Sequence, residues 1–294
     1  MTKFIRSATV VIRIHKNDFS GYEETITLKG LRVAFGIQKN LAVQTNVGII
    51  RLWNLNPSHR NALKGYGDEV TIYAGYERGA GEQLLYRGDT TAISHSFDLP
   101  EIVTTLECGD GERYVNQKHQ SLSFQAGTKV EDIIRAIAAK MGISIVEPPS
   151  NALASLGNMV YELGFSTTGM LKEALTKVTA YAGLQWSVQN NGLQIIPQDG
   201  TIAQPAYSIN ADNGMVGIPR RFTYKRQDFY VDGPQVGWKV DTLLDPFLIP
   251  GFKVNVTSRY LNWQGIFRIE TVRHQGDTHG APWESNLELT QLAP

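Results

Sequence analysis

The sequence predicts an α+β protein that is mainly β, with two all-β modules separated by a mixed α/β insertion. Three observations support this fold class. Runs of period-two alternation dominate the first hundred residues, two amphipathic helices appear only in the middle, and strand-like runs return after residue 216. The predicted units are an N-terminal β module over residues 1–112, the insertion over 113–200 and a C-terminal β module over 201–294.

The N-terminal module is predicted from six runs of β-branched and aromatic residues, separated by Gly, Asn, Asp or Pro. One short helix interrupts them, because Asn56 can cap a helix, Pro57 fits its first position and Gly65 can end it. Six strands with one small helix indicate a strongly curved sheet or a small barrel. The runs span residues 8–14, 23–37, 46–55, 68–77, 83–98 and 102–112.

The insertion contains two copies of a helix-strand unit. In the first copy, residues 124–146, Thr128 and Glu131 have the capping-box spacing, and Gly142 can stop the helix. The second copy covers residues 165–188 and carries the same apolar stripe. The equivalent positions are Phe124 and Phe165, Val130 and Leu171, Ile134 and Leu175, Ile137 and Val178, and Gly142 and Gly183.

The insertion ends in a predicted β-hairpin over residues 184–197, with Asn191-Gly192 as its turn. Residues 198–215 are polar and rich in turn formers, which is typical of a linker. From residue 216 to the end, five further strand-like runs predict the C-terminal β module.

Composition limits the classes of function. Lys plus Arg equals Asp plus Glu, 28 of each, and this balance argues against a free nucleic-acid-binding protein. The single cysteine, Cys108, excludes an intrachain disulfide and a cysteine-based metal cluster, and its strand context predicts a small buried residue. The N-terminus lacks an apolar run long enough for a signal peptide or membrane span. We therefore expect a cytoplasmic protein, or one in a particle assembled there.

Motifs for catalysis or phosphate binding are weak. Two glycine-bearing stretches, GAGEQ and GDGER, lack the strand-loop-helix context of a nucleotide site. The acidic group Glu107, Asp110 and Glu112 predicts a solvated loop after a strand, because a calcium site would need more ligands at ordered spacing. The basic run at residues 220–227, with Arg220, Arg221, Lys225 and Arg226, predicts a strand with one solvated face, or else a surface for nucleic acid or an acidic partner.

The stretch RHQGDTHGAPW, residues 273–283, contains His274, Asp277 and His279 within six positions. These residue types could bind zinc. However, all three lie in one glycine-flanked segment between two strand-like runs, where Asp and His next to glycines favour a tight turn. A hairpin turn is therefore the preferred interpretation, and a metal site is the alternative.

Two C-terminal stretches resemble those of bacteriophage tail baseplate hub proteins, the late control protein D or contractile-tail hub family. The order of the N-terminal and middle elements is also similar to that family, so the resemblance extends over nearly the whole chain. The first stretch supplies Leu243, Leu244, Pro246, Leu248, Pro250 and Gly251, and the second supplies Val272, His274, Gly276, Asp277, Thr278, His279, Gly280 and Trp283.

The resemblance implies two small tube-like β-barrel modules with the α/β insertion between them. It also implies a homotrimer whose six barrels make a pseudo-sixfold ring, joining a sixfold tail tube to a threefold spike. Its expected partners are itself, the tail tube protein, the central spike protein and other baseplate subunits, with DNA passing through the lumen without sequence-specific binding. Its expected place is the virion tail baseplate, after synthesis in the bacterial host cytoplasm.

We therefore expect a structural protein, with no enzyme activity, no cofactor, no metal and no catalytic residue. One alternative is a hub or spike base of a related machine: a contractile bacteriocin, a secretion system or a non-contractile tail. A second is a small metallohydrolase using His274, Asp277 and His279. The residues expected to form contact or turn elements are His274, Asp277, His279, Trp283, Leu243 and Pro250.

Overall fold

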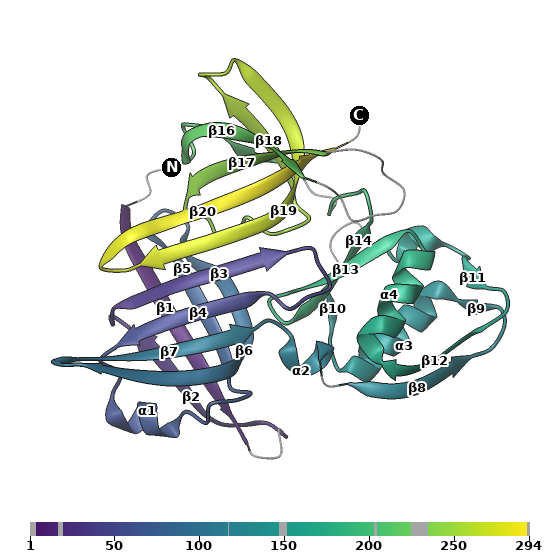
Figure 1. The fold of residues 1–294 in the computed structure, drawn as a ribbon, viewed down its shortest axis with the longest axis horizontal. Coiled ribbons are helices and arrows are strands. Elements are labelled where there is room, and N and C mark those ends of the chain that lie inside the picture. The colour runs from purple at the N-terminus through teal and green to yellow at the C-terminus, as the bar shows by residue number, and fades with distance from the viewer. Residues whose placement is uncertain are drawn as a thin grey trace.

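The computed structural model describes residues 4–16, 20–116, 118–146, 152–202, 205–224 and 235–292. Within these ranges the chain forms one large curved sheet, with a small helical unit beside it (Figure 1). Strands dominate and helices are few, so the predicted mainly β member of the α+β class is confirmed.

The N-terminal half consists of seven strands and one short helix. The helix α1 (Pro57–Ala62) begins as predicted, with Pro57 at its start and Asn56 Oδ1 accepting from Ser58 N at 2.9 Å. It ends at Ala62 with Leu63 as its C-cap, and not at the predicted Gly65. Alternate side chains of the strands fill one apolar core, which includes the buried Cys108. The strands are β1 (Phe4–His15), β2 (Tyr22–Lys29), β3 (Val33–Asn40), β4 (Val47–Trp53), β5 (Glu69–Arg78), β6 (Gly81–Asp98) and β7 (Glu101–Gly109).

The C-terminal half has a second apolar core of its own. The predicted linker at residues 198–215 contributes a short strand, β15 (Tyr207–Ile209), which pairs in parallel with β18. The other strands are β16 (Met215–Tyr224), β17 (Gln235–Leu243), β18 (Lys253–Ser258), β19 (Trp263–Asp277) and β20 (Gly280–Gln291).

The two halves share a single 13-stranded sheet, because β3 pairs antiparallel with β19. The main path runs β16-β17-β20-β19-β3-β4-β7-β6-β5-β1-β2, with β18 and β15 branching from β19. The expectation of two separate β-barrels is therefore wrong for the described residues, in which this path stays open at both ends. The physical reason is that the second part of β19 pairs with β3 of the other half. That edge of β19 is therefore not available to close a barrel within the C-terminal half.

The halves nevertheless repeat one arrangement. The consecutive strands β3 to β7 lie in the spatial order β3-β4-β7-β6-β5, and the consecutive strands β16 to β20 lie in the order β16-β17-β20-β19-β18. Every neighbouring pair in both orders is antiparallel. This repeat in strand order was not among the predictions from the residue pattern.

The insertion lies between β7 and β15 in the chain and packs around a third core. The two predicted helix-strand units are present, and Gly142 ends the first helix with φ of 80°. The predicted capping box is wrong, because Thr128 Oγ1 donates to Gln125 O and Lys129 occupies the cap position. None of the helices in the described ranges is long and apolar enough to span a bilayer.

The elements of the insertion are α2 (Glu112–Val115), β8 (His119–Phe124), β9 (Thr128–Lys129), α3 (Val130–Met141), β10 (Ile145–Val146), η1 (Ala154–Leu156), β11 (Val160–Tyr161), β12 (Phe165–Met170), α4 (Leu171–Tyr181), β13 (Leu184–Gln189) and β14 (Gly192–Pro197).

Candidate functional site

The 273–283 stretch forms the end of the β19–β20 hairpin, and its turn docks on the start of β3. Asp277 accepts two hydrogen bonds from the Arg32 guanidinium, at 3.3 and 2.8 Å. Thr278 N donates to Val33 O, and Val33 N donates to Thr278 Oγ1, both at 3.0 Å. Burial raises the pKa of Asp277, but the hydrogen bonds from Arg32 and from His279 N outweigh it and hold this pKa below its ordinary value. The turn thus binds one half of the sheet to the other.

Trp283 holds the same hairpin in place through buried aromatic contacts. Its ring is buried and packs edge-on against Phe35, with centroids 5.4 Å apart, and against Tyr76 at 6.5 Å. Gly276 leaves room for these rings, because a Cβ at this position would lie 2.3 Å from Phe35 and 2.8 Å from Trp283. This glycine therefore allows a close approach rather than a special backbone angle.

His274 lies on β19 with no exposed surface. Its Nδ1 is 2.8 Å from Ser285 Oγ, which also accepts from Asp245 N at 3.0 Å. Burial and, second, the nearby charge of Lys39 lower the pKa of His274 to about 3. The imidazole is therefore neutral near pH 7 and serves as a packed hydrogen-bonding group.

The 243–251 run connects β17 to β18 and contacts all three parts of the chain, because its buried Leu244 packs in the apolar core of the N-terminal half. Leu243 is exposed, and Leu244 N donates to Trp283 O at 3.2 Å. At the other end, Pro250 O accepts from the buried Gln194 Nε2 of the insertion at 3.0 Å, and Gly251 N donates to Ile269 O at 2.8 Å. The run therefore lies where the C-terminal half meets the insertion.

The turn of the β13–β14 hairpin enters the N-terminal half around one buried carboxylate. Asp110 follows β7 and accepts hydrogen bonds from the backbone N–H groups of Asn190 and Asn191, at 2.7 and 2.5 Å. Lys39 Nζ donates to Asn190 Oδ1 at 2.8 Å. Burial raises the pKa of Asp110 to about 6 and lowers that of Lys39 to about 8. Their opposite charges counteract both shifts, so the two groups stabilise each other's charged form.

Two predictions at this junction are wrong. Asp110 does not lie in a solvated loop, although Glu107 of the same acidic group is exposed. The hairpin turn is Asn190-Asn191, with φ of 56° and 61°, and not Asn191-Gly192. Asn tolerates the left-handed conformation that a two-residue hairpin turn requires at both positions, which explains the one-residue error.

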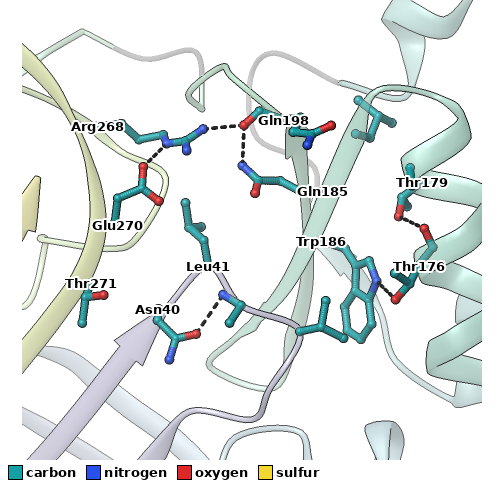
Figure 2. A pocket seen from close by; sticks show the side chains of 14 residues that line it. Asn40, Leu41, Thr176, Thr179, Gln185, Trp186, Gln198, Arg268, Glu270 and Thr271 are labelled. Carbon is teal, nitrogen blue, oxygen red and sulfur yellow. Dashed lines mark hydrogen bonds and ion pairs between the residues drawn. The ribbon is translucent and has the colours of Figure 1, made fainter. Parts of the chain in front are cut away.

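A groove of about 460 Å³ lies between the insertion and β19 (Figure 2). Arg268 forms an ion pair with Glu270 at 2.6 Å and donates to Gln198 O at 2.8 Å. On the opposite wall, Trp186 Nε1 donates to Thr176 Oγ1 at 3.0 Å. The Arg268 contacts connect the end of the insertion to β19.

The three candidate zinc ligands do not converge. His274 is buried, Asp277 is bound to Arg32, and His279 is exposed with its Nδ1 2.9 Å from Thr278 Oγ1. Across the described ranges, no group of three or more His, Cys, Asp or Glu side chains could hold a metal ion. Of the basic run, Arg220 and Arg221 are exposed on β16, and Lys225 and Arg226 lie outside the described residues.

Comparison with known families identifies the chain. The family model described as "Baseplate hub gp41" matches residues 9–262, which is most of the sequence. This protein belongs to that baseplate hub family. The match includes the 243–251 run and ends before the 273–283 turn, so the link between that turn and the family rests on the resemblance in sequence alone. No curated protein sequence matches the hub chain.

Solved structures share the fold of this hub protein. The tail protein from Neisseria meningitidis MC58 aligns with a TM-score of 0.65 and 11% identity, over 97% of the hub chain and 96% of its own. The 43 kDa tail protein of prophage MuSo2 from Shewanella oneidensis gives 0.64 and 11%, over 97% of each chain. The E. coli c3393 protein, described as a type VI secretion component, gives 0.59 and 11%, over 89% and 74%. At such low identity these matches show a common fold.

Family and fold together assign the hub chain a structural role in a tail baseplate. The geometry agrees with that role, since the candidate site is a set of junctions between strands. The residues singled out in the sequence, His274, Asp277, Trp283 and Pro250, lie at these junctions. Sequence reasoning missed Arg32 and Lys39 and placed Asp110 in a solvated loop, because each of the three lies far in sequence from the group that it contacts.

Proposed function

We propose that this protein is the central hub of a tail baseplate, a homotrimer that adapts the sixfold tail tube to the threefold spike. The observation that supports it is the repeat of strand order between the two halves of one chain. Three such chains supply six similar β units, so a ring with threefold symmetry offers an approximately sixfold surface. A head-to-tail ring of this kind needs each chain to carry two complementary surfaces.

The partners follow from this geometry. The sixfold face of the ring binds the tail tube protein, the threefold face binds the central spike protein, and the outer surface meets other baseplate subunits. DNA passes through the lumen without sequence-specific contacts. The role is mechanical and not enzymatic, and the particle is contractile and is assembled after synthesis in the host cytoplasm.

The 273–283 turn and the 243–251 run serve this function as fixed contact elements. We call the pairing of β3 with β19, which joins the two halves, the seam. The Arg32–Asp277 ion pair stabilises the seam at its end, and the buried rings of Phe35 and Trp283 pack against each other beside it. A rigid seam keeps the two β units of each chain at one mutual angle, which a closed ring requires.

The mass of the purified protein in solution tests the proposal. Light scattering after size exclusion is expected to give three times the chain mass, and electron microscopy of the particle is expected to show a threefold ring on the tail axis. A stable monomer, a ring of another order or a position away from the axis would contradict the proposal.

A second candidate is the spike base of a related secretion machine, which the likeness to the c3393 protein favours. Co-purification distinguishes the two. A baseplate hub is expected to remain with tail tube and sheath proteins in intact phage particles, whereas a secretion component is found in cells without virions.

A further inference from the structure

Several strand edges of the 13-stranded sheet are covered by no strand of the described chain, and two of them are the second part of β6 and the outer edge of β16. β6 pairs with β5 only as far as Asp89, so the part from Ala92 to Asp98 pairs with β7 alone. β16, at the end of the sheet order, pairs with β17 alone. Unpaired edges of this length are sites at which another chain can add a strand.

We propose that the free part of β6 in one copy pairs antiparallel with β16 of the next copy, with Ser94 opposite Phe222. This contact would repeat, between subunits, the β19–β3 seam found within each chain. The inference rests on the proposed ring and specifies which strands close it.

The internal repeat shows that β6 corresponds to β19 residue by residue. In β6 the register with β7 shifts between Thr90 and Ala92, and in β19 the register with β20 shifts between Ile269 and Thr271. Each strand changes its second partner at that shift, as β6 leaves β5 and β19 leaves β18. The equivalent positions are Asp89 and Arg268, Thr90 and Ile269, Ile93 and Val272, Ser94 and Arg273, His95 and His274, and Asp98 and Asp277.

The two histidines support this correspondence with chemistry. His95 Nδ1 lies 3.1 Å from Thr104 Oγ1, and His274 Nδ1 lies 2.8 Å from Ser285 Oγ. Thr104 and Ser285 are the cross-strand partners of the two histidines. The same residue type therefore makes the same contact to a hydroxyl on the neighbouring strand in each half.

The side chains of β19 are more buried than their counterparts on β6, as expected if β6 lacks a neighbouring strand that β19 has. Val272 and His274 have no exposed surface, because β3 covers that edge of β19. Their counterparts Ile93 and His95 are half-buried and exposed. Phe97, on the same free part of β6, is 65% exposed. A strand placed along β6, as β3 is along β19, would cover these side chains.

The opposite edge, β16, is the counterpart of β3. A row of paired residues runs Asp89–Gly109–Val47–Gln38 in the N-terminal half. The equivalent row in the C-terminal half runs Arg268–Thr290–Gly237–Phe222. Phe222 of β16 therefore occupies the position of Gln38 of β3.

The register of β3 with β19 within one chain predicts the register of β16 with β6 between copies. Gln38 pairs with Arg273, whose counterpart on β6 is Ser94, so Ser94 of one copy faces Phe222 of the next. The same register brings Phe97 to the irregular part of β16 that carries Val216 and Ile218. These two side chains are 47% and 48% exposed, so apolar surface on both edges would be covered together.

Disulfide trapping tests the pairing. In the double variant Ser94→Cys with Phe222→Cys, oxidation is expected to link the copies into dimers and trimers on a non-reducing gel. Six strands separate β16 from β6 in the sheet order, so the link is not expected to form within one chain. The native Cys108 is buried and stays unlinked. The control pair Ser94→Cys with Arg220→Cys is two residues out of register and is expected to link at least tenfold less.

The outcomes separate the two proposals. A trimer in solution that fails to cross-link, or that links equally in the control pair, would overturn the β6–β16 pairing and leave the trimeric hub intact. A protein that stays monomeric would overturn both. As a second measurement, Ile218→Asp is expected to convert trimers to monomers, whereas Leu163→Asp, at a 98% exposed site on the insertion, is expected to leave them trimeric.

Discussion

His274 shows how burial changes the role of a residue that looks reactive in sequence. The sequence around His274 predicts a hairpin turn and leaves a metal site as the alternative. In the structure this imidazole has no exposed surface and lies within hydrogen-bonding distance of Ser285 inside the sheet. Its pKa of about 3 keeps it neutral. The residue therefore contributes to stability, and its contribution depends on pH.

The pH dependence has a definite sign. The folded pKa lies below the ordinary value of 6.5, so the unfolded chain binds the additional proton. The contribution of His274 to the free energy of unfolding is fully present above pH 6.5 and decreases as the pH falls towards 3. Between pH 7 and pH 5, the wild type is expected to lose about 2 kcal/mol of unfolding free energy that His274→Asn does not lose. Urea unfolding at both pH values checks this, and equal losses in the two proteins would contradict it.

Asp110 is the second residue whose environment only the structure reveals. The change Asp110→Ala leaves the turn N–H groups of Asn190 and Asn191 without their acceptor and removes the charge that compensates the buried Lys39. We expect a loss of about 3–5 kcal/mol in unfolding free energy at pH 7. Glu107→Ala, an exposed acid from the same sequence cluster, is the matched control and is expected to change it by less than about 0.5 kcal/mol. Equal effects would show that the junction is not a stabilising contact.

At the scale of elements, local patterns predicted most strands and helices, because alternation and the helical stripe record which face is buried. The errors occurred at a helix start and a hairpin turn, where a single hydrogen bond or backbone angle determines the exact residue. Thr128 bonds back to Gln125 instead of capping α3, and Asn190 instead of Gly192 enters the turn. Such choices depend on small differences in energy that a residue pattern does not record.

The β19–β20 hairpin offers a prediction at this scale. Gly276→Ala places a Cβ against the rings of Phe35 and Trp283 and is expected to destabilise the protein by about 1–3 kcal/mol. Gly280→Ala is the matched control, because its Cβ would lie at an ordinary 3.4 Å from Asp277. Thermal unfolding of both variants checks the difference, and similar melting temperatures would contradict it.

At the scale of the molecule, the boundaries of the insertion remain a prediction. Its apolar cluster consists of its own residues, from Val115 to Ile195, separate from the two β cores. We therefore expect residues 113–200 to fold when expressed alone, with helical circular dichroism and a cooperative thermal transition. An unfolded fragment would show that the junction with Asp110 is needed for folding and that the insertion is not an independent unit.

The sequence by itself determined the mainly β class, the two helix-strand units, the α1 cap and the resemblance to baseplate hubs. These follow from periodicity, turn residues and residue order, which are local properties. Only the tertiary structure decided that β3 and β19 merge the two halves, that Lys39 and Asp110 share a buried junction, and that β6 and β16 are left with open edges. Strand pairing joins residues more than two hundred positions apart, and alternation fixes which face of a strand is buried without naming the strand beside it.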